Sequence, residues 1–302
     1  MRRRSEVHHG SRRLALVSLL ALGLGLASTA VACASNEPVR NGFVEDEPEA
    51  GPPPVDTTFG DASGPIDDDV ECAPGNQKIY VVGTDKGFYR FDPEKLDFER
   101  IGTLGCPTGA GTFSMAIDRR GTAWVEYTDG RLYAVDTRDA TCKPTSFQPD
   151  QTGFETFGMG FALNTDDPKG GEKLYVAGAG LATIDTKTFG LNFLGSLTYG
   201  RTELTSIGSQ LYAFSVESGV VARLNKTNGA TEVTHRTTAI ETRAAFAFAH
   251  WGGIFWIFTG QTTSKVTTYS PDTDESKVVM PNTGMLIVGA GSSTCAPITP
   301  PK

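Results

Sequence analysis

Short hydrophobic runs alternate with polar or glycine-rich turns from residue 77 to residue 280 of the chain. Five times, a run centred on an aromatic residue is followed by a turn and a second hydrophobic run, which usually ends in Asp or Asn. The aromatic residues in register are Tyr80, Trp124, Tyr175, Tyr212 and Trp256, at spacings of 44, 51, 37 and 44 residues. Several short strands in a unit of about forty residues are typical of β-propeller blades.

Each blade needs four strands, and the sequence supplies candidates for all of them. A third hydrophobic segment follows each pair of runs, at 98–101, 145–147, 191–194, 230–234 and 276–279. Segments rich in Gly, Ala and Ser start at Phe113, Phe157, Glu203 and Ala245, and their small side chains suit the crowded centre of a ring. The first unit has no such segment before it, so we expect 285–290 to complete its blade. The sequence therefore predicts an all-β fold, a five-bladed β-propeller closed by a C-terminal strand.

Two repeated features have structural explanations. We expect the five aromatics in register to pack in the core, because aromatic and β-branched side chains fill half-buried sheet faces. The series Asp92, Asp136, Asp185 and Asn225 is interpreted as turn-forming, since short acid and amide side chains accept hydrogen bonds from the backbone two residues further on.

The chain contains five cysteines, and Cys33 stands apart from the other four. Cys72 precedes the first unit and Cys295 follows the closing strand, so a disulfide between them would lock the ring where its two ends meet. Cys106 and Cys142 are then left to pair. This connectivity is favoured over the other two that four cysteines allow. None of the four has the spacing of metal ligands, so we expect no zinc site.

Residues 1–32 are predicted to be an export signal. Five arginines precede the apolar stretch 14–32, and Cys33 follows it directly. The segment Ala30-Val31-Ala32-Cys33 resembles the bacterial lipoprotein box, although Ala30 stands where Leu is usual. That resemblance implies a lipid on Cys33 and weakly favours the outer membrane, because no Asp follows the cysteine. Simple secretion, a periplasmic location and an uncleaved membrane anchor stay open as alternatives.

Residues 33–71 are predicted to form a disordered tether, and residues 72–302 the propeller domain. Positions 34–71 hold six prolines and eleven acids, too little apolar surface to fold independently. The acidic run could instead bind calcium, but its acids are irregularly spaced and interrupted by proline. The chain carries a net charge of −8. Because residues 34–71 carry −10 and residues 1–32 carry +4, the propeller carries only −2 and offers no basic stripe for nucleic acid.

A binding site is expected at the mouth of the central channel. The loops that lead into the innermost strands bring acids, arginines and aromatics to one face of the ring. The candidate ligand-binding residues are Phe154, Glu155, Tyr199, Arg201, Glu203, Glu241 and Arg243. Such a mixture suits a polar ligand such as a glycan or a peptide. The alternative is a ring of surface ion pairs, each contributing less than about 1 kcal/mol.

A hydrolase is the second interpretation. Some five-bladed propellers are glycoside hydrolases, and two carboxylates about 5–9 Å apart would be needed for that reaction. Glu155, Glu203 and Glu241 could supply the pair, but no local motif of such enzymes surrounds them, and fold does not determine activity. We therefore assign no catalytic residue, no cofactor and no metal from the sequence.

The blade pattern and the N-terminal segment together resemble bacterial lipoproteins with quinoprotein-like or YVTN-like repeat propellers. This resemblance rests on the pattern of strands and on the signal, and it implies no activity. The lipid signal, the long tether and a propeller without a catalytic set of residues favour a non-catalytic binding or scaffold protein, tethered to the cell envelope by lipid, with a protein, peptide or glycan as partner.

Overall fold

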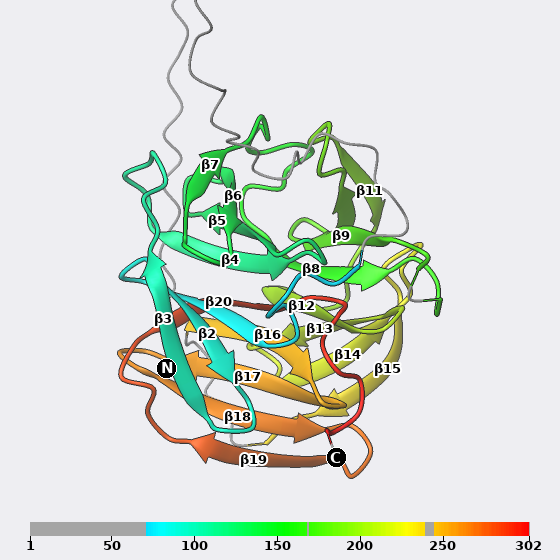
Figure 1. Ribbon diagram of the computed structural model, residues 1–302. Helices are drawn as coiled ribbons and strands as arrows, with labels where there is room; N and C mark the ends of the chain where they lie inside the picture. The colour runs from blue at the N-terminus through cyan, green and yellow to red at the C-terminus, as the bar shows by residue number, and fades with distance from the viewer. Residues whose placement is uncertain (1–70, 168, 239–244, 302) are drawn as a thin grey trace, which may run out of the picture. The chain divides into compact units, whose positions relative to one another are not determined.

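The computed structural model describes residues 71–167, 169–238 and 245–301. The predicted export signal, Cys33 and the tether up to residue 70 lie outside the described residues, as do Glu241 and Arg243. The described residues contain twenty β-strands and no helix. They form five antiparallel four-stranded sheets arranged as a five-bladed β-propeller (Figure 1). This confirms the predicted fold.

Each blade consists of four strands, named below from the innermost to the outermost. Blade 1 contains β20 (Ile287–Ser292), β1 (Ile79–Gly83), β2 (Gly87–Asp92) and β3 (Asp97–Thr103). Blade 2 contains β4 (Thr112–Ile117), β5 (Thr122–Tyr127), β6 (Leu132–Asp136) and β7 (Cys142–Pro144). Blade 3 contains β8 (Gly158–Leu163), β9 (Glu172–Ala177), β10 (Leu181–Ile184) and β11 (Leu191–Gly195). Blade 4 contains β12 (Thr202–Ile207), β13 (Gln210–Ser215), β14 (Val220–Leu224) and β15 (Thr231–Arg236). Blade 5 contains β16 (Ala245–Trp251), β17 (Ile254–Gly260), β18 (Ser264–Ser270) and β19 (Glu275–Met280).

The ring closes in blade 1, where the last strand of the chain pairs with the first. Strand β20 lies antiparallel to β1, with Tyr80 opposite Gly291 and Val81 opposite Ala290. The closing strand lies two residues later than the predicted segment 285–290. The Cys72–Cys295 disulfide joins the two ends beside this pairing, and Cys106–Cys142 joins blade 1 to blade 2. Both predicted bonds are therefore confirmed.

The innermost strands pack against each other around the central axis, and glycines allow the closest approaches. A Cβ atom on Gly158 of β8 would lie 2.0 Å from the carbonyl oxygen of Thr202, at the start of β12. A Cβ atom on Gly291 of β20 would lie 3.1 Å from the amide nitrogen of Ile117 on β4. The predicted enrichment in small residues is thus a requirement of backbone packing at the centre.

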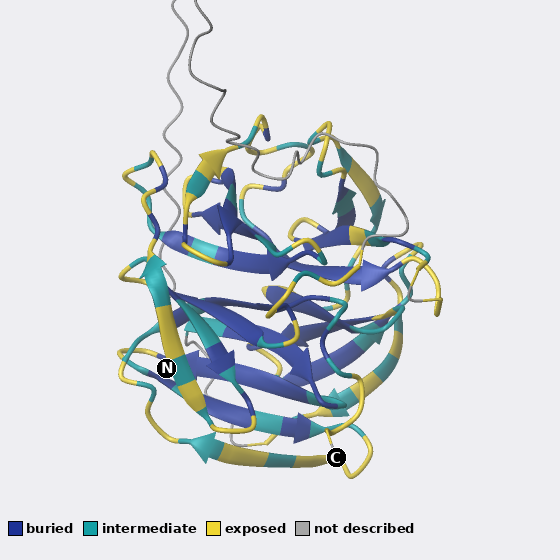
Figure 2. Cartoon of the chain, viewed as in Figure 1, coloured by how far each residue is buried: buried dark blue, intermediate teal, exposed yellow. Residues whose placement is uncertain are grey.

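The core lies between neighbouring blades, and the outermost strands face solvent (Figure 2). The five aromatics in register are all buried, as predicted, and none exposes more than 7% of its surface. Phe91 of blade 1, for example, packs edge-on against Trp256 of blade 5, with ring centroids 5.5 Å apart. Burial of these large side chains is the main stabilising contribution to the ring.

The turns before the outermost strands follow one pattern. Asp92, Asp136, Asp185 and Asn225 each accept a hydrogen bond from the amide two residues further on, at 2.8–3.0 Å, as predicted. The residue four positions further on then adopts a positive φ, as at Ala140 (64°). The equivalent residues in the other blades are Leu96, Phe189, Gly229 and Asp274.

One strand assignment was wrong. The segment 145–147 was expected to be the outermost strand of blade 2, but the structure places β7 at Cys142–Pro144. Thr145 instead donates its hydroxyl to the carbonyl of Leu132, and Phe147 is buried in the core between blades 2 and 3. The hydrophobic Phe147 therefore marks a loop that returns to the core.

Candidate functional site

The propeller has a top face, where the innermost strands begin, and a bottom face, where they end. The loops that lead into β8 and β12 lie on the top face and carry the described candidate residues. Glu155 is exposed in the first of these loops. Phe154 beside it is fully buried, with its ring centroid 6.4 Å from that of Phe157. The aromatic surface predicted at this position therefore belongs to the core.

Arg201 is exposed on the loop before β12 and has a strained backbone, with φ at +40°. Its guanidinium carbon lies 5.4 Å from the centre of the Phe246 ring, at the start of β16. An arginine over an aromatic face is a cation–π contact, and both residue types are common at the centres of binding surfaces. A non-glycine residue at positive φ costs free energy that the surrounding structure must supply.

Tyr199 lies earlier in the same loop, partly buried against blade 4. Its hydroxyl is 3.4 Å from the hydroxyl of Thr234 on the outermost strand β15. The structure thus brings Arg201 together with Phe246, which the sequence did not single out, and directs the Tyr199 hydroxyl toward the outer edge of the blade. Ligand binding by these residues stays a prediction.

Glu203 lies one residue beyond the start of β12 and is 3% exposed. One of its oxygens, Oε2, accepts hydrogen bonds from the Ser114 hydroxyl at 2.8 Å and from the Met159 amide at 3.4 Å. These partners come from β4 and β8, so the side chain connects the innermost strands of three blades. Burial raises the pKa of Glu203 well above its ordinary value, although both hydrogen bonds oppose that shift.

Glu126 on β5 is a second buried acid near the top face, and none of its surface is exposed. Its Oε2 accepts a hydrogen bond from the Phe157 amide at 3.0 Å, whereas its Oε1 has no hydrogen-bonding partner. Burial raises the pKa of Glu126, and the negative charge of Glu203 raises it further. Sequence reasoning missed Glu126. The available signal was an acid at a buried position of the hydrophobic run TAWVEY.

A different polar cluster occupies the bottom face. Glu172 begins β9, and its two carboxylate oxygens accept hydrogen bonds from the Arg119 amide at 2.7 Å and the Thr294 hydroxyl at 2.6 Å. Burial, followed by the charge of Asp118, raises the pKa of Glu172 to about 8. The side chain thereby connects blade 3 to blade 2 and to the segment after the closing strand.

His250 lies at the bottom end of β16 and is 1% exposed. Its Nε2 accepts a hydrogen bond from the Gly253 amide at 3.2 Å. Burial lowers the pKa of His250 to about 4, so the imidazole is neutral at neutral pH.

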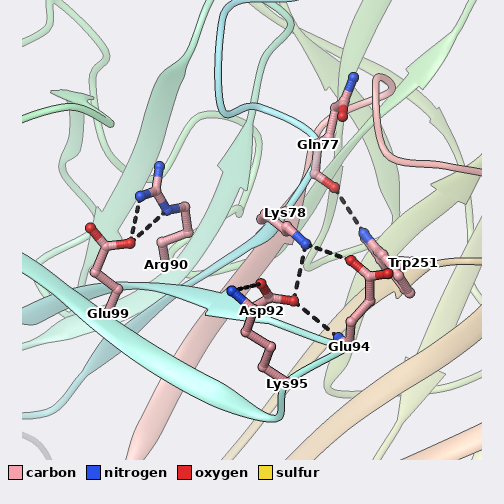
Figure 3. A network of polar contacts seen from close by, with 8 residues as sticks. All are labelled: Gln77, Lys78, Arg90, Asp92, Glu94, Lys95, Glu99 and Trp251. Carbon is pink, nitrogen blue, oxygen red and sulfur yellow. Dashed lines mark hydrogen bonds and ion pairs between the residues drawn. The ribbon is translucent and has the colours of Figure 1, made fainter. Parts of the chain in front are cut away.

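A network of ion pairs lies on the outer part of blade 1 (Figure 3). The Lys78 ammonium is 3.0 Å from both Asp92 Oδ1 and Glu94 Oε2, and it lies 5.6 Å from the centre of the Trp251 ring. These charges neutralise one another near the surface, and the network is interpreted as structural.

Two classes of site are absent from the described residues. In 71–167, 169–238 and 245–301, no three His, Cys, Asp or Glu side chains are grouped so as to hold a metal ion. Within the same ranges, no helix has the length and hydropathy needed to cross a membrane.

Comparison with known proteins identifies similarity in fold only. No protein-family model and no curated protein matches the chain. A chain of the nidogen/laminin complex has 14% identity and a TM-score of 0.45, over 72% of this chain and 86% of that one. A protein of unknown function from Bacteroides caccae has 13% identity and a TM-score of 0.41, over 71% of this chain and 98% of that one. Similarity at this level bears on neither ligand nor activity.

Proposed function

We propose that this protein is a non-catalytic binding propeller, tethered to the cell envelope by a lipid on Cys33, which presents its top face to a glycan or protein partner. The observation that carries the proposal is the Arg201–Phe246 pair, an exposed arginine held in a strained backbone conformation over an aromatic ring. Strain of this kind is common at functional sites.

The point at which the chain joins the propeller supports a role for the top face. Cys72 is bonded to Cys295, and the Ala73 amide donates a hydrogen bond to the Arg119 carbonyl just beyond the end of β4. Cys72 therefore lies at the bottom face, at the opposite end of the ring from Arg201.

Binding is tested with the full chain against a panel of neutral and acidic polysaccharides and acidic peptides, by calorimetry. We expect a subset to bind, with at least about a tenfold loss of affinity for Arg201→Ala, a typical cost for an anchor side chain. Arg236→Ala, an exposed arginine on the outermost strand β15, serves as the matched control. Equal losses for the two variants would contradict a site at the channel mouth.

Hydrolysis is tested on the same panel and on aryl glycosides. We expect no turnover. If the unmodified protein shows turnover and Glu155→Gln loses it, the protein is a hydrolase and the binding proposal is wrong.

The lipid anchor has its own test. Cys33→Ala is expected to release the protein from membranes, whereas retention would indicate an uncleaved N-terminal helix.

A further inference from the structure

Glu126 and Glu203 lie 77 residues apart in the sequence. In the structure they come together at the start of strand β8, along the edge that faces the channel. Their Oε2 atoms accept hydrogen bonds from the amides of Phe157 and Met159, which are two residues apart. Strand β8 pairs only with β9 within its sheet, so amides that bond outside the sheet lie on the edge facing the channel. The two amides are about 6.6 Å apart along that edge, since a strand rises about 3.3 Å per residue. The two carboxylates therefore lie side by side.

Among the described residues, the charges around this pair are unbalanced. The described side chains whose charges act on Glu126 are Glu203 and Asp129, and both are negative. Among the described residues, no lysine or arginine forms an ion pair with either carboxylate. Removing a carboxylate from water without a cation carries a large free-energy cost. Glu126 Oε1 is buried and accepts no hydrogen bond, so its full coordinating capacity is unused.

The atoms available here to coordinate a cation are all oxygens. Besides the two carboxylates, the Ser114 hydroxyl lies 2.8 Å from Glu203 Oε2. In an extended strand the amide and the carbonyl of one residue point to the same edge, so the Phe157 and Met159 carbonyls also face the channel. Carboxylate, hydroxyl and carbonyl oxygens are the ligands of hard cations. Ca²⁺ tolerates irregular arrangements of such ligands better than Mg²⁺ does.

We propose that Glu126, Glu203 and Ser114 form a site for a hard divalent cation, Ca²⁺ in the first place, inside the top end of the central channel. An ion 2.3–2.6 Å from each carboxylate requires oxygens no more than about 5 Å apart, and carboxylates attached to amides two residues apart on one strand edge permit this separation. The site is separate from the proposed ligand surface at Arg201, because its residues lie within the ring. It would connect blades 2, 3 and 4 around the cation.

The test is thermal unfolding of the full chain after chelation, with and without added Ca²⁺. At a Ca²⁺ concentration about one hundred times the Kd, we expect the Tm to rise by about 5–10 °C. Mg²⁺ should have a smaller effect. Glu126→Gln and Glu203→Gln keep the size of each side chain and are expected to abolish the Ca²⁺ response.

Glu172→Gln is the matched control, because Glu172 is a largely buried glutamate whose two oxygens already accept hydrogen bonds. It should retain the full Ca²⁺ response. No Ca²⁺ response in the unmodified protein would overturn the proposal and indicate a protonated carboxyl pair. An equal loss in Glu172→Gln would also overturn it.

A second measurement covers variants that fail to fold. Equilibrium dialysis of the unmodified chain against Ca²⁺ is compared with Ser114→Ala, which removes one neutral oxygen and no charge. We expect about a tenfold weaker Kd in Ser114→Ala. An unchanged Kd would assign the bound Ca²⁺ to the acidic run at 34–71 and overturn the channel site.

Discussion

The top end of the ring holds two buried glutamates and the bottom end a largely buried one, but the carboxylate oxygens find partners in different ways at the two ends. At the bottom, both oxygens of Glu172 accept hydrogen bonds, from Arg119 and Thr294. At the top, Glu126 has one oxygen bonded to an amide and one without a partner. A buried acid whose oxygens are all bonded connects segments of the fold. A buried acid with an unused oxygen indicates a requirement beyond folding.

The largest expected effect comes from Gly158→Ala, which disturbs the packing that positions the top acids. The added Cβ would lie 2.0 Å from the Thr202 carbonyl oxygen and 2.7 Å from Glu203 Cα. We expect a loss of more than about 5 kcal/mol in the free energy of unfolding, measured by urea denaturation, because two backbone segments would have to separate. Gly105→Ala is the control, because a Cβ there meets no atom within 4 Å. A tolerated Gly158→Ala would show that β8 and β12 can separate.

The second effect concerns the bottom end, where the ring is closed. Removing the Cys72–Cys295 bond as Cys72→Ser with Cys295→Ser opens a loop with a sequence separation of 223. The loop-entropy relation gives a loss of up to roughly 5 kcal/mol, against roughly 4 kcal/mol for Cys106–Cys142 with its separation of 36. Chemical denaturation of the two double variants compares them directly. A larger loss for the second pair would contradict this ranking.

Glu172→Gln sharpens the comparison through its pH dependence. The pKa of Glu172 is raised to about 8 in the folded protein, so its stabilising contribution is complete below the unfolded value near 4.5 and is lost as the pH rises to about 8. We expect the unmodified protein to lose roughly 1–3 kcal/mol more than Glu172→Gln over this range, a figure reduced for the partial exposure of the residue. Denaturation midpoints across the range provide the measurement. Parallel pH profiles would mean that Glu172 is ionised throughout.

The smallest effect is expected for Lys78→Ala, which removes the centre of the surface network in Figure 3. The ammonium pairs with Asp92 and Glu94, but partly exposed ion pairs contribute less than about 1 kcal/mol. Added salt should reduce the difference from the unmodified protein. Lys95→Ala, whose side chain is 76% exposed, should have no measurable effect. A loss well above 1 kcal/mol would mean that Lys78, like Glu172, makes contacts on which the stability of the ring depends.

The fold could be predicted because it depends on features that repeat. The blades could be placed from the five aromatic runs and the four turn residues. The missing innermost strand of the first unit indicated how the ring closes and, with it, how the cysteines pair. The single strand error arose at Phe147, where hydrophobicity indicated a strand but the side chain fills the core from a loop. The positive φ at Leu96, Ala140 and Phe189 was not predicted, because nothing in those residue types favours it.

The candidate site was only partly accessible from the sequence. Loop position correctly indicated that Arg201 is exposed on the top face, but not that Phe246 lies beneath its guanidinium. Glu203 was expected at the mouth and lies buried, because Gly158 lets its strand approach β8 closely. Glu126 was missed because its role depends on an amide in the neighbouring blade, a contact that no local pattern encodes.

The closing pair of β1 and β20 has a consequence for how the protein is made. Blade 1 has only three strands, with the edge of β1 uncovered, until residues 287–292 pair with it. A chain that stops before that point cannot complete the ring, however many of its blades have formed. Premature termination at any codon before this strand, even one that leaves the other four blades whole, should therefore yield a product that exposes a sheet edge and is prone to aggregate.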